Sequence, residues 1–243
     1  MIISHKHKFI FIRPQKVAST SVEMNLLKHC CDSDIIRGPE NFSSRYDEEA
    51  VDVKDLYFKN ANRKLRTHLK PKQIRHLIGK EKWDQYYKFT ITRNPWDRYI
   101  FYYYWKKHRL KHLVINKTLY ALKHPLHSKA KKNCIKQIKQ YNRFTRSQNI
   151  KKICKRFHGF TPDESGKPFC DYYIRFSHLE EDYKHLCEKL NISYEPLPRY
   201  KSKLRKKALP RSYTKKTEKI IGEIFQDEIN YFGYKSILEK SQT

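Results

Sequence analysis

The chain has 243 residues, 38% of them hydrophobic, which is enough for one well-filled core and short for two independent domains. The formal net charge of +28, from 53 Lys and Arg against 25 Asp and Glu, exceeds what solubility requires and indicates an anionic partner, substrate or cofactor. Neither a signal-peptide pattern nor a run of about 20 apolar residues is present, so we expect a soluble, cytoplasmic protein. The expected organisation is a single domain over residues 1–243, with helical or loop inserts at about 32–66 and 106–166.

The six cysteines show neither a CxxC pair nor zinc-type spacing with histidine. Reduced thiols are therefore expected, and a bridge between Cys154 and Cys170 is the alternative for an exported protein.

The stretch KFIFIRPQKVASTSVEMNLL, near the start of the chain, predicts a first strand-turn-helix unit. Its apolar run Phe9–Ile12 is typical of a short buried strand, and the apolar residues of 22–30 recur at helical spacing. Thr20 and Glu23 match a capping box, in which the two side chains satisfy backbone N–H groups at the helix start.

The turn of this unit indicates an anion site. Converging backbone N–H groups at a helix start favour an anion, Lys16 adds a full charge, and the hydroxyl groups of Ser19, Thr20 and Ser21 can donate to it. A phosphate or sulfate group is the expected ligand. The segment is not a nucleotide-kinase P-loop, because that motif places its lysine after two glycines and directly before Ser or Thr.

A second unit follows the same order. Tyr87–Thr92 predicts a strand, Arg93 stands at its end, and Asn94 and Pro95 supply an N-cap and a first helical residue. The aromatic run Tyr99–Trp105 follows at helical spacing. It predicts a mostly buried helix in preference to a base-stacking surface.

The third unit and the end of the chain complete the pattern. Tyr172–Phe176 predicts a strand, and an amphipathic helix is expected to follow it to about Leu190. Ser177 is the expected cap of this helix, and Glu180 would complete a capping box with it. A last amphipathic helix is expected over about Thr214–Tyr231.

Three such units predict an α/β fold with a central, mainly parallel sheet flanked by helices. Ligands of these folds collect at the carboxyl ends of the strands. The loops Arg13–Ser21 and Arg93–Arg98 are therefore the expected ligand-binding loops.

Four segments together resemble the sulfotransferases that use 3′-phosphoadenosine 5′-phosphosulfate (PAPS), of the carbohydrate, family 2-like type. Lys16–Ser21 (KVASTS) looks like their 5′-phosphosulfate loop and Arg93–Arg98 (RNPWDR) like their 3′-phosphate motif, in matching order and spacing. Tyr172–Asp182 and the basic segment 201–205 also look like elements of this branch. The similarity spans the chain from about Phe9 to Tyr234.

The resemblance implies a P-loop-like three-layer fold, PAPS as donor, adenosine 3′,5′-bisphosphate as product and no metal. A carbohydrate hydroxyl is the implied acceptor, and the surplus positive charge favours an anionic glycan. Lys16 is the implied catalytic cation, since it would neutralise charge on the departing nucleotide. The implied cofactor-binding residues are Lys16, Val17, Ala18, Ser19, Thr20, Ser21, Arg93, Ser202 and Arg205.

Two departures and one open role accompany this reading. Gln15 stands where the family more often has proline before the lysine. Phe101 stands where family members usually carry a serine, so Ser202 or Arg205 is expected to replace that 3′-phosphate contact. His68 occupies the place of the histidine that accepts the acceptor proton in similar enzymes, with Asp97 and Glu40 as competitors. For Arg98 we favour a structural role.

Two other functions stay open at this point. A nucleic-acid-binding protein would use the lysine-rich surface of residues 106–156, although nucleic acid is not the expected partner. A P-loop-type kinase would share the fold, but the chain lacks its glycines and its lysine position.

Overall fold

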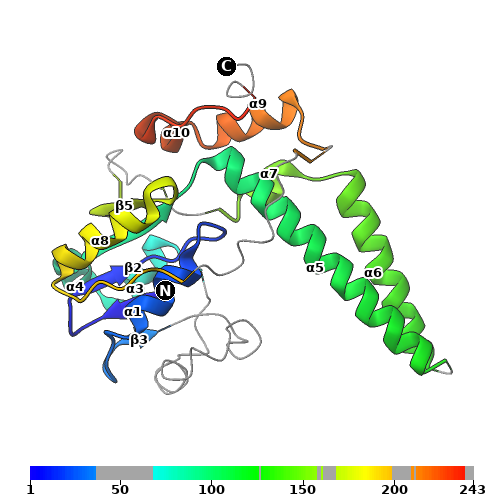
Figure 1. The fold of residues 1–243 in the computed structure, drawn as a ribbon, viewed down its shortest axis with the longest axis horizontal. Helices are drawn as coiled ribbons and strands as arrows, with labels where there is room; N and C mark the ends of the chain where they lie inside the picture. The colour runs from blue at the N-terminus through cyan, green and yellow to red at the C-terminus, as the bar shows by residue number, and fades with distance from the viewer. Residues whose placement is uncertain are drawn as a thin grey trace. The chain divides into compact units, whose positions relative to one another are not determined.

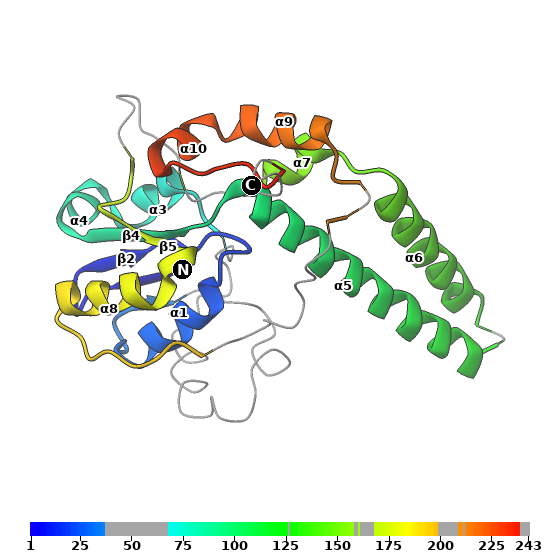
Figure 2. The same cartoon turned by 45° about the horizontal axis from the view of Figure 1, so that its top comes forward.

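The computed structural model describes residues 1–36, 68–125, 127–157, 160, 168–198, 209–210 and 212–238. Contacts group the chain into two compact units. The first unit combines Met1–Arg93 with Phe157–Tyr200, and the second combines Asn94–Arg156 with Lys201–Thr243. Figures 1 and 2 show the elements of each unit.

The first unit is built on a five-stranded sheet with the strand order β3-β1-β2-β4-β5. β2 and β4 are parallel, as are β4 and β5, whereas β1 runs antiparallel to both β2 and β3. Four of the five strands thus point the same way, which confirms the mainly parallel sheet. The strands are β1 (Ile2–Ser4), β2 (Phe9–Phe11), β3 (Ile35–Ile36), β4 (Tyr87–Thr92) and β5 (Tyr172–Arg175).

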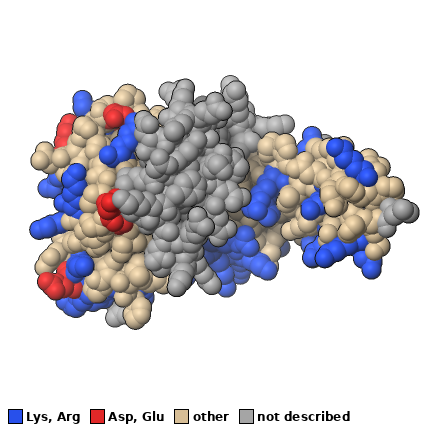
Figure 3. All heavy atoms as spheres, turned by 90° about the horizontal axis from the view of Figure 1, so that it is seen from below, with Lys and Arg blue, Asp and Glu red and all other residues tan. Residues whose placement is uncertain are grey.

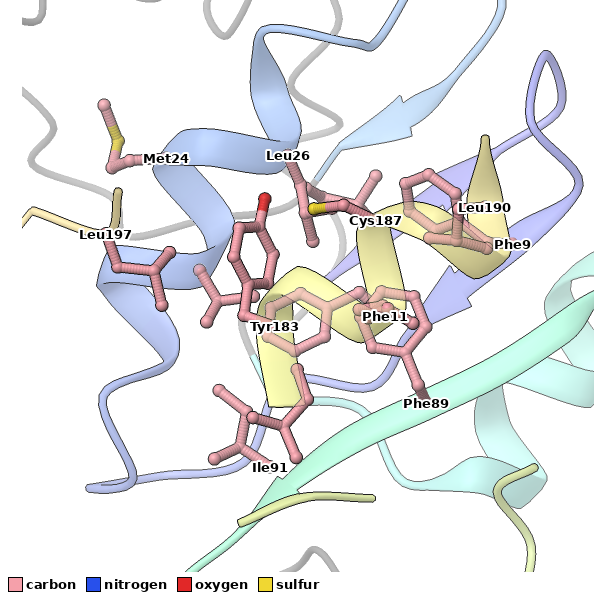
Figure 4. Close-up of a cluster of buried hydrophobic side chains, with 14 of the residues drawn as sticks. Phe9, Phe11, Met24, Leu26, Phe89, Ile91, Tyr183, Cys187, Leu190 and Leu197 are labelled. Atoms are coloured by element: carbon pink, nitrogen blue, oxygen red, sulfur yellow. The ribbon is translucent and has the colours of Figure 1, made fainter. Parts of the chain in front are cut away.

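Helices cover both faces of this sheet, because its central strands are apolar on both sides. Phe9 and Phe11 pack on one face with α1 and α8, and Ile10 and Ile12 pack on the opposite face with α3 and α4. Figure 4 shows the first of these clusters. The unit therefore has the expected three layers. The helices are α1 (Ser19–Leu27), α3 (Pro71–Ile78), α4 (Lys80–Gln85) and α8 (Leu179–Leu190), with a 3₁₀ turn at Phe176–His178.

The prediction for the third strand-turn-helix unit was wrong at its turn. The 3₁₀ turn separates β5 from α8, so Ser177 does not cap the helix. Glu180 accepts from the backbone N–H of Leu197 at 2.8 Å instead of completing a capping box. The turn is held by Asp182, which accepts from the backbone and side chain of Arg175 at 2.6 to 2.9 Å.

The second unit is helical. Asn94 caps α5 as predicted, because its side chain accepts from the N–H groups of Trp96 and Asp97 at 3.1 and 3.3 Å, and Pro95 follows it. Four of the seven residues in the run that follows are buried and the other three are half-buried, which supports its interpretation as core. The helices are α5 (Pro95–Lys123), α6 (Ser128–Arg146), α7 (Ile150–Cys154), α9 (Lys215–Ile224) and α10 (Gln226–Phe232).

α5 and α6 form an antiparallel hairpin whose arms run side by side in both cartoon views (Figures 1 and 2). Tyr103 stacks on Phe144 near its base, with ring centroids 5.5 Å apart. At the end of the chain, the single helix expected over 214–231 was wrong: Thr214 caps α9, and Phe225 separates α9 from α10.

The structure shows all six cysteine side chains as free thiols, so the alternative bridge between Cys154 and Cys170 is absent. Burial raises the pKa of the Cys154 thiol to about 12, although the positive charge of Arg98 opposes the shift. None of the helices in the described ranges combines the length and apolarity that crossing a bilayer requires.

Candidate active site

The loop between β2 and α1 makes a tight turn without glycine. Lys16 and Ala18 adopt the left-handed backbone conformation, with φ of 64° and 63°. Such residues cost of order 1 kcal/mol or more each, so the surroundings must hold them. Val17 between them is fully buried in the core, and the Ser19 hydroxyl donates to the Pro14 carbonyl at 2.5 Å. The turn is thus anchored on both sides.

This turn delivers the N-terminus of α1 to the end of β2. α1 begins at Ser19, and the first N–H groups of a helix have no acceptor within it. Ser21 donates back to the Ala18 carbonyl at 3.0 Å, which leaves the N–H groups of Ser19 and Thr20 as those that the helix itself does not use. Together with the helix dipole they form a site suited to a phosphate or sulfate.

The capping box predicted for Thr20 and Glu23 was wrong. The residue before α1 is Ala18, and no side chain caps the helix. Glu23 is only 1% exposed, and its Oε2 lies 2.8 Å from the Nε of Arg13. Its other oxygen accepts from the nitrogen of Met1 at 2.9 Å. A carboxylate this deeply buried needs charged partners, and this requirement outweighs the local capping pattern.

Arg13 is a site residue that the sequence pattern did not single out. It stands two residues after β2, is 8% exposed, and donates through Nη2 to the Thr20 hydroxyl at 3.2 Å. It therefore ties Thr20, the most exposed of the three loop hydroxyl residues, to the end of the strand. The available signal was the charge itself, since an arginine next to a buried strand needs a partner.

Arg93 joins this loop from the neighbouring parallel strand. It follows β4, is 2% exposed, and its Nη1 donates to the Lys16 carbonyl at 3.1 Å. The ring of Phe176, directly after β5, lies 3.9 Å from the guanidinium carbon. Residues that follow β2, β4 and β5 are thereby brought together, as expected for the carboxyl ends of parallel strands. Phe176 had no assigned role in the sequence.

His68 lies at the same edge. Its Nδ1 is 2.9 Å from the Arg13 carbonyl oxygen, which can only accept, so Nδ1 carries the hydrogen in this contact. In the neutral imidazole the basic lone pair is then on Nε2. The histidine predicted as the proton acceptor is therefore held against the Arg13–Ser21 loop in the tautomer suited to that role.

The remaining predicted residues either belong to the second unit or fall outside the described residues. Ser202, Arg205 and Glu40 fall outside the described residues. Within the second unit, Asp97 belongs to the first turn of α5, Arg98 is 1% exposed, and Phe101 is half-buried. Burial of Arg98 agrees with the structural role favoured for it.

Comparison with known proteins identifies the chain at the level of its family. The model of the Sulfotransferase family matches residues 1–235, which include both motif loops and all five strands. No curated protein and no solved structure gives a significant match. With nearly the whole chain covered and the two motif loops in contact, this protein belongs to the sulfotransferase family, whose members transfer sulfuryl groups.

Proposed function

We propose that this sulfotransferase moves the sulfuryl group from PAPS to a hydroxyl of an anionic carbohydrate. The observation that carries the proposal is the hydrogen bond from Arg93 to the Lys16 carbonyl. It joins the loops after two neighbouring parallel strands, each with a cationic side chain. PAPS presents two anionic ends, and this arrangement offers a basic group for each.

The residues present fit the two ends of the donor. The N–H groups of Ser19 and Thr20 at the start of α1, with Lys16 beside them, suit the 5′-phosphosulfate. Arg93 presents a planar fork that suits the 3′-phosphate, and both its bond to Lys16 and its stacking on Phe176 fix the plane of that fork. Val17 is buried, so it would contribute through its backbone alone.

The chemistry assigned to the chain is charge neutralisation and one proton transfer. The acceptor oxygen forms a bond to sulfur while the bond from sulfur to the nucleotide oxygen breaks. The Lys16 ammonium would stabilise the negative charge left on that oxygen, which is larger in the transition state than in the ground state. His68 Nε2 would accept the proton of the acceptor hydroxyl.

The carbohydrate acceptor is supported by the charge of the chain and by the resemblance of its motifs. A net charge of +28 raises the local concentration of an anionic glycan far more than that of a neutral one. A screen with labelled donor should therefore find sulfate transfer to acidic polysaccharides before neutral ones. Transfer to neutral sugars alone would contradict this part of the proposal.

Calorimetric titration with adenosine 3′,5′-bisphosphate tests donor binding directly. Lys16→Ala and Arg93→Ala should each weaken binding by about 30-fold or more, because each removes a charged contact. Lys28→Ala and Arg75→Ala are matched controls at exposed positions, the first directly after α1 and the second on α3, and both should bind like the natural protein. Preference for ATP with magnesium dependence would instead favour a kinase.

A further inference from the structure

The α5–α6 hairpin carries an unusual concentration of exposed apolar side chains. Ten large hydrophobic residues are exposed among the described residues, and six of them belong to these two helices. Leu122 and Leu119 are 71% and 53% exposed, and Ile135 is 52% exposed. Isolated exposed apolar residues need no explanation, but a group on one structure indicates an interaction surface. The six are Ile115, Leu119, Tyr120, Leu122, Ile135 and Ile138.

Five of these six side chains share one side of the hairpin. The Thr118 hydroxyl lies 3.3 Å from the Cys134 thiol, so this pair marks the line along which the two helices touch. At about 100° per residue, Leu122, Ile115 and Leu119 lie about 40°, 60° and 100° around α5 from Thr118, all in one rotational sense.

The isoleucines of α6 turn to the same side. Ile138 and Ile135 lie about 40° and 100° around α6 from Cys134, in the same rotational sense. The two helices run antiparallel (Figures 1 and 2), so an equal sense of rotation takes both sets of side chains to one side of the hairpin. We call this surface, formed by Ile115, Leu119, Leu122, Ile135 and Ile138, the apolar hairpin face.

Basic residues surround this face, and acidic residues are missing from it. Residues 94–156 contain 18 Lys and Arg but one acid, Asp97, which lies at the far end of α5. By the same angular count Lys131 shares the side of the apolar hairpin face, and Lys123 and Lys139 lie at its border, about 140° around. Figure 3 shows blue side chains and no red ones on the part of the hairpin that faces the viewer.

We propose that the apolar hairpin face docks on the surface of a bilayer that contains anionic lipid. Aliphatic side chains ringed by lysines match such a surface, since the apolar groups enter the headgroup boundary while the lysine stems reach the lipid phosphates. Charge complementarity selects this occupant. A second copy of the hairpin would bring two strongly basic surfaces together, and a nucleic acid would leave the leucines and isoleucines without a partner.

Vesicle flotation tests the proposal with the whole 243-residue chain. Binding is expected to vesicles of phosphatidylcholine mixed with phosphatidylserine, to weaken at high salt, and to be much lower on phosphatidylcholine alone. Replacing both leucines, as Leu119→Asn with Leu122→Asn, should lower the partition coefficient by roughly tenfold or more. Ile224→Asn is the matched control, because Ile224 is 41% exposed but lies on α9; it should float like the natural protein.

A second pair of changes keeps the test sharp if the leucine variant folds poorly. Lys131→Gln with Lys139→Gln should lower partitioning by about fivefold per lysine on the anionic vesicles and have little effect on the neutral ones. Circular dichroism and titration with adenosine 3′,5′-bisphosphate report folding and the donor site separately. Failure of donor binding would therefore leave the vesicle result intact.

Three results would overturn the proposal. The first is equal binding to neutral and anionic vesicles, and the second is full binding by the leucine variant. The third is a different occupant. Duplex DNA bound equally well by the natural protein and the leucine variant would indicate a nucleic-acid surface, and a dimer in sedimentation equilibrium that the leucine changes dissolve would indicate a second copy.

Discussion

The sheet of the first unit and the hairpin of the second differ in how many of their side chains are buried. All residues of β1 and β2 are buried, and helices pack on both faces of the sheet. In the hairpin, which the structure describes along both helices, α5 buries no residue after Leu110 and α6 buries only Ala130. The sheet can therefore position ligand groups rigidly, whereas the outer part of the hairpin leaves nearly all its described side chains unburied.

The largest effect is expected in the core of the sheet. Phe89 is fully buried between Phe9 and Phe11, at centroid distances of 5.5 and 5.4 Å. Phe89→Ala should lower the free energy of unfolding by about 3 to 5 kcal/mol, because it removes apolar burial and leaves a cavity. Urea denaturation measures this loss. A loss under about 1 kcal/mol would show that the sheet core is not tightly packed.

The effect of Lys16→Ala on activity should be nearly as large, whereas its effect on the free energy of unfolding should be small. Loss of a charge at the departing oxygen is expected to lower the turnover rate by about 100- to 1,000-fold. Initial rates with labelled donor measure the effect, and the urea midpoint should stay close to that of the natural protein because Lys16 is half-buried in a loop. An equal fall in stability and activity would contradict a catalytic role.

The ion pair between Arg13 and Glu23 gives a third test. Arg13→Met should cost about 3 kcal/mol of stability, because it removes a charged partner from a buried carboxylate. Adding Glu23→Gln should recover part of that loss, since the neutral amide removes the buried carboxylate charge while its oxygen can still accept from the Met1 nitrogen. Denaturant unfolding of both variants measures the difference. A double variant less stable than Arg13→Met would show that the pair is not the cause.

A smaller, pH-dependent effect is expected at Asp182. Desolvation raises the pKa of this carboxyl, but hydrogen bonds and charge from Arg175 outweigh it, so the pKa in the folded state is lowered. A lowered folded pKa means that the ionised carboxyl contributes stability at neutral pH and loses it as the pH falls through the acidic range below about 4. Asp182→Asn should therefore destabilise at pH 7 and matter less at acid pH. Unfolding free energies across this range check the trend.

The smallest effect should come from the hairpin. Leu122→Ala should change stability by no more than about 0.5 kcal/mol, because the side chain is 71% exposed. Thermal unfolding without lipid measures it. A loss as large as that of Phe89→Ala would mean that Leu122 is covered by the protein itself, and the contrast between the two units would fail.

Local patterns predicted the elements that carry the site. An apolar run followed by an N-cap predicted β4 and the start of α5, because Asn94 and Pro95 act through neighbouring residues only. Local patterns also predicted β2 and the turn that contains Lys16. Contact between Lys16 and Arg93 followed from the rule on parallel strand ends, and the structure contains it.

Local patterns gave wrong predictions where a contact outside the pattern determines the conformation. Glu23 and Glu180 both matched capping boxes, but each carboxylate has a partner elsewhere, Arg13 for one and Leu197 for the other. β1 and β3 have three and two residues, too few to show any periodicity. The roles of Arg13 and Phe176 depend on their contacts with Thr20 and Arg93, and no local spacing reveals these contacts.

The stacking of Phe176 on Arg93 and the bond from Arg93 to Lys16 make the candidate site depend on the assembled sheet. Its parts come from three strands, and the Arg93–Lys16 bond alone joins positions 77 residues apart. A partly assembled sheet could not offer the complete arrangement, so a nucleotide would bind the finished state in preference to any earlier one. By mass action such a ligand would stabilise the folded state, and the melting temperature would rise with the logarithm of the ligand concentration.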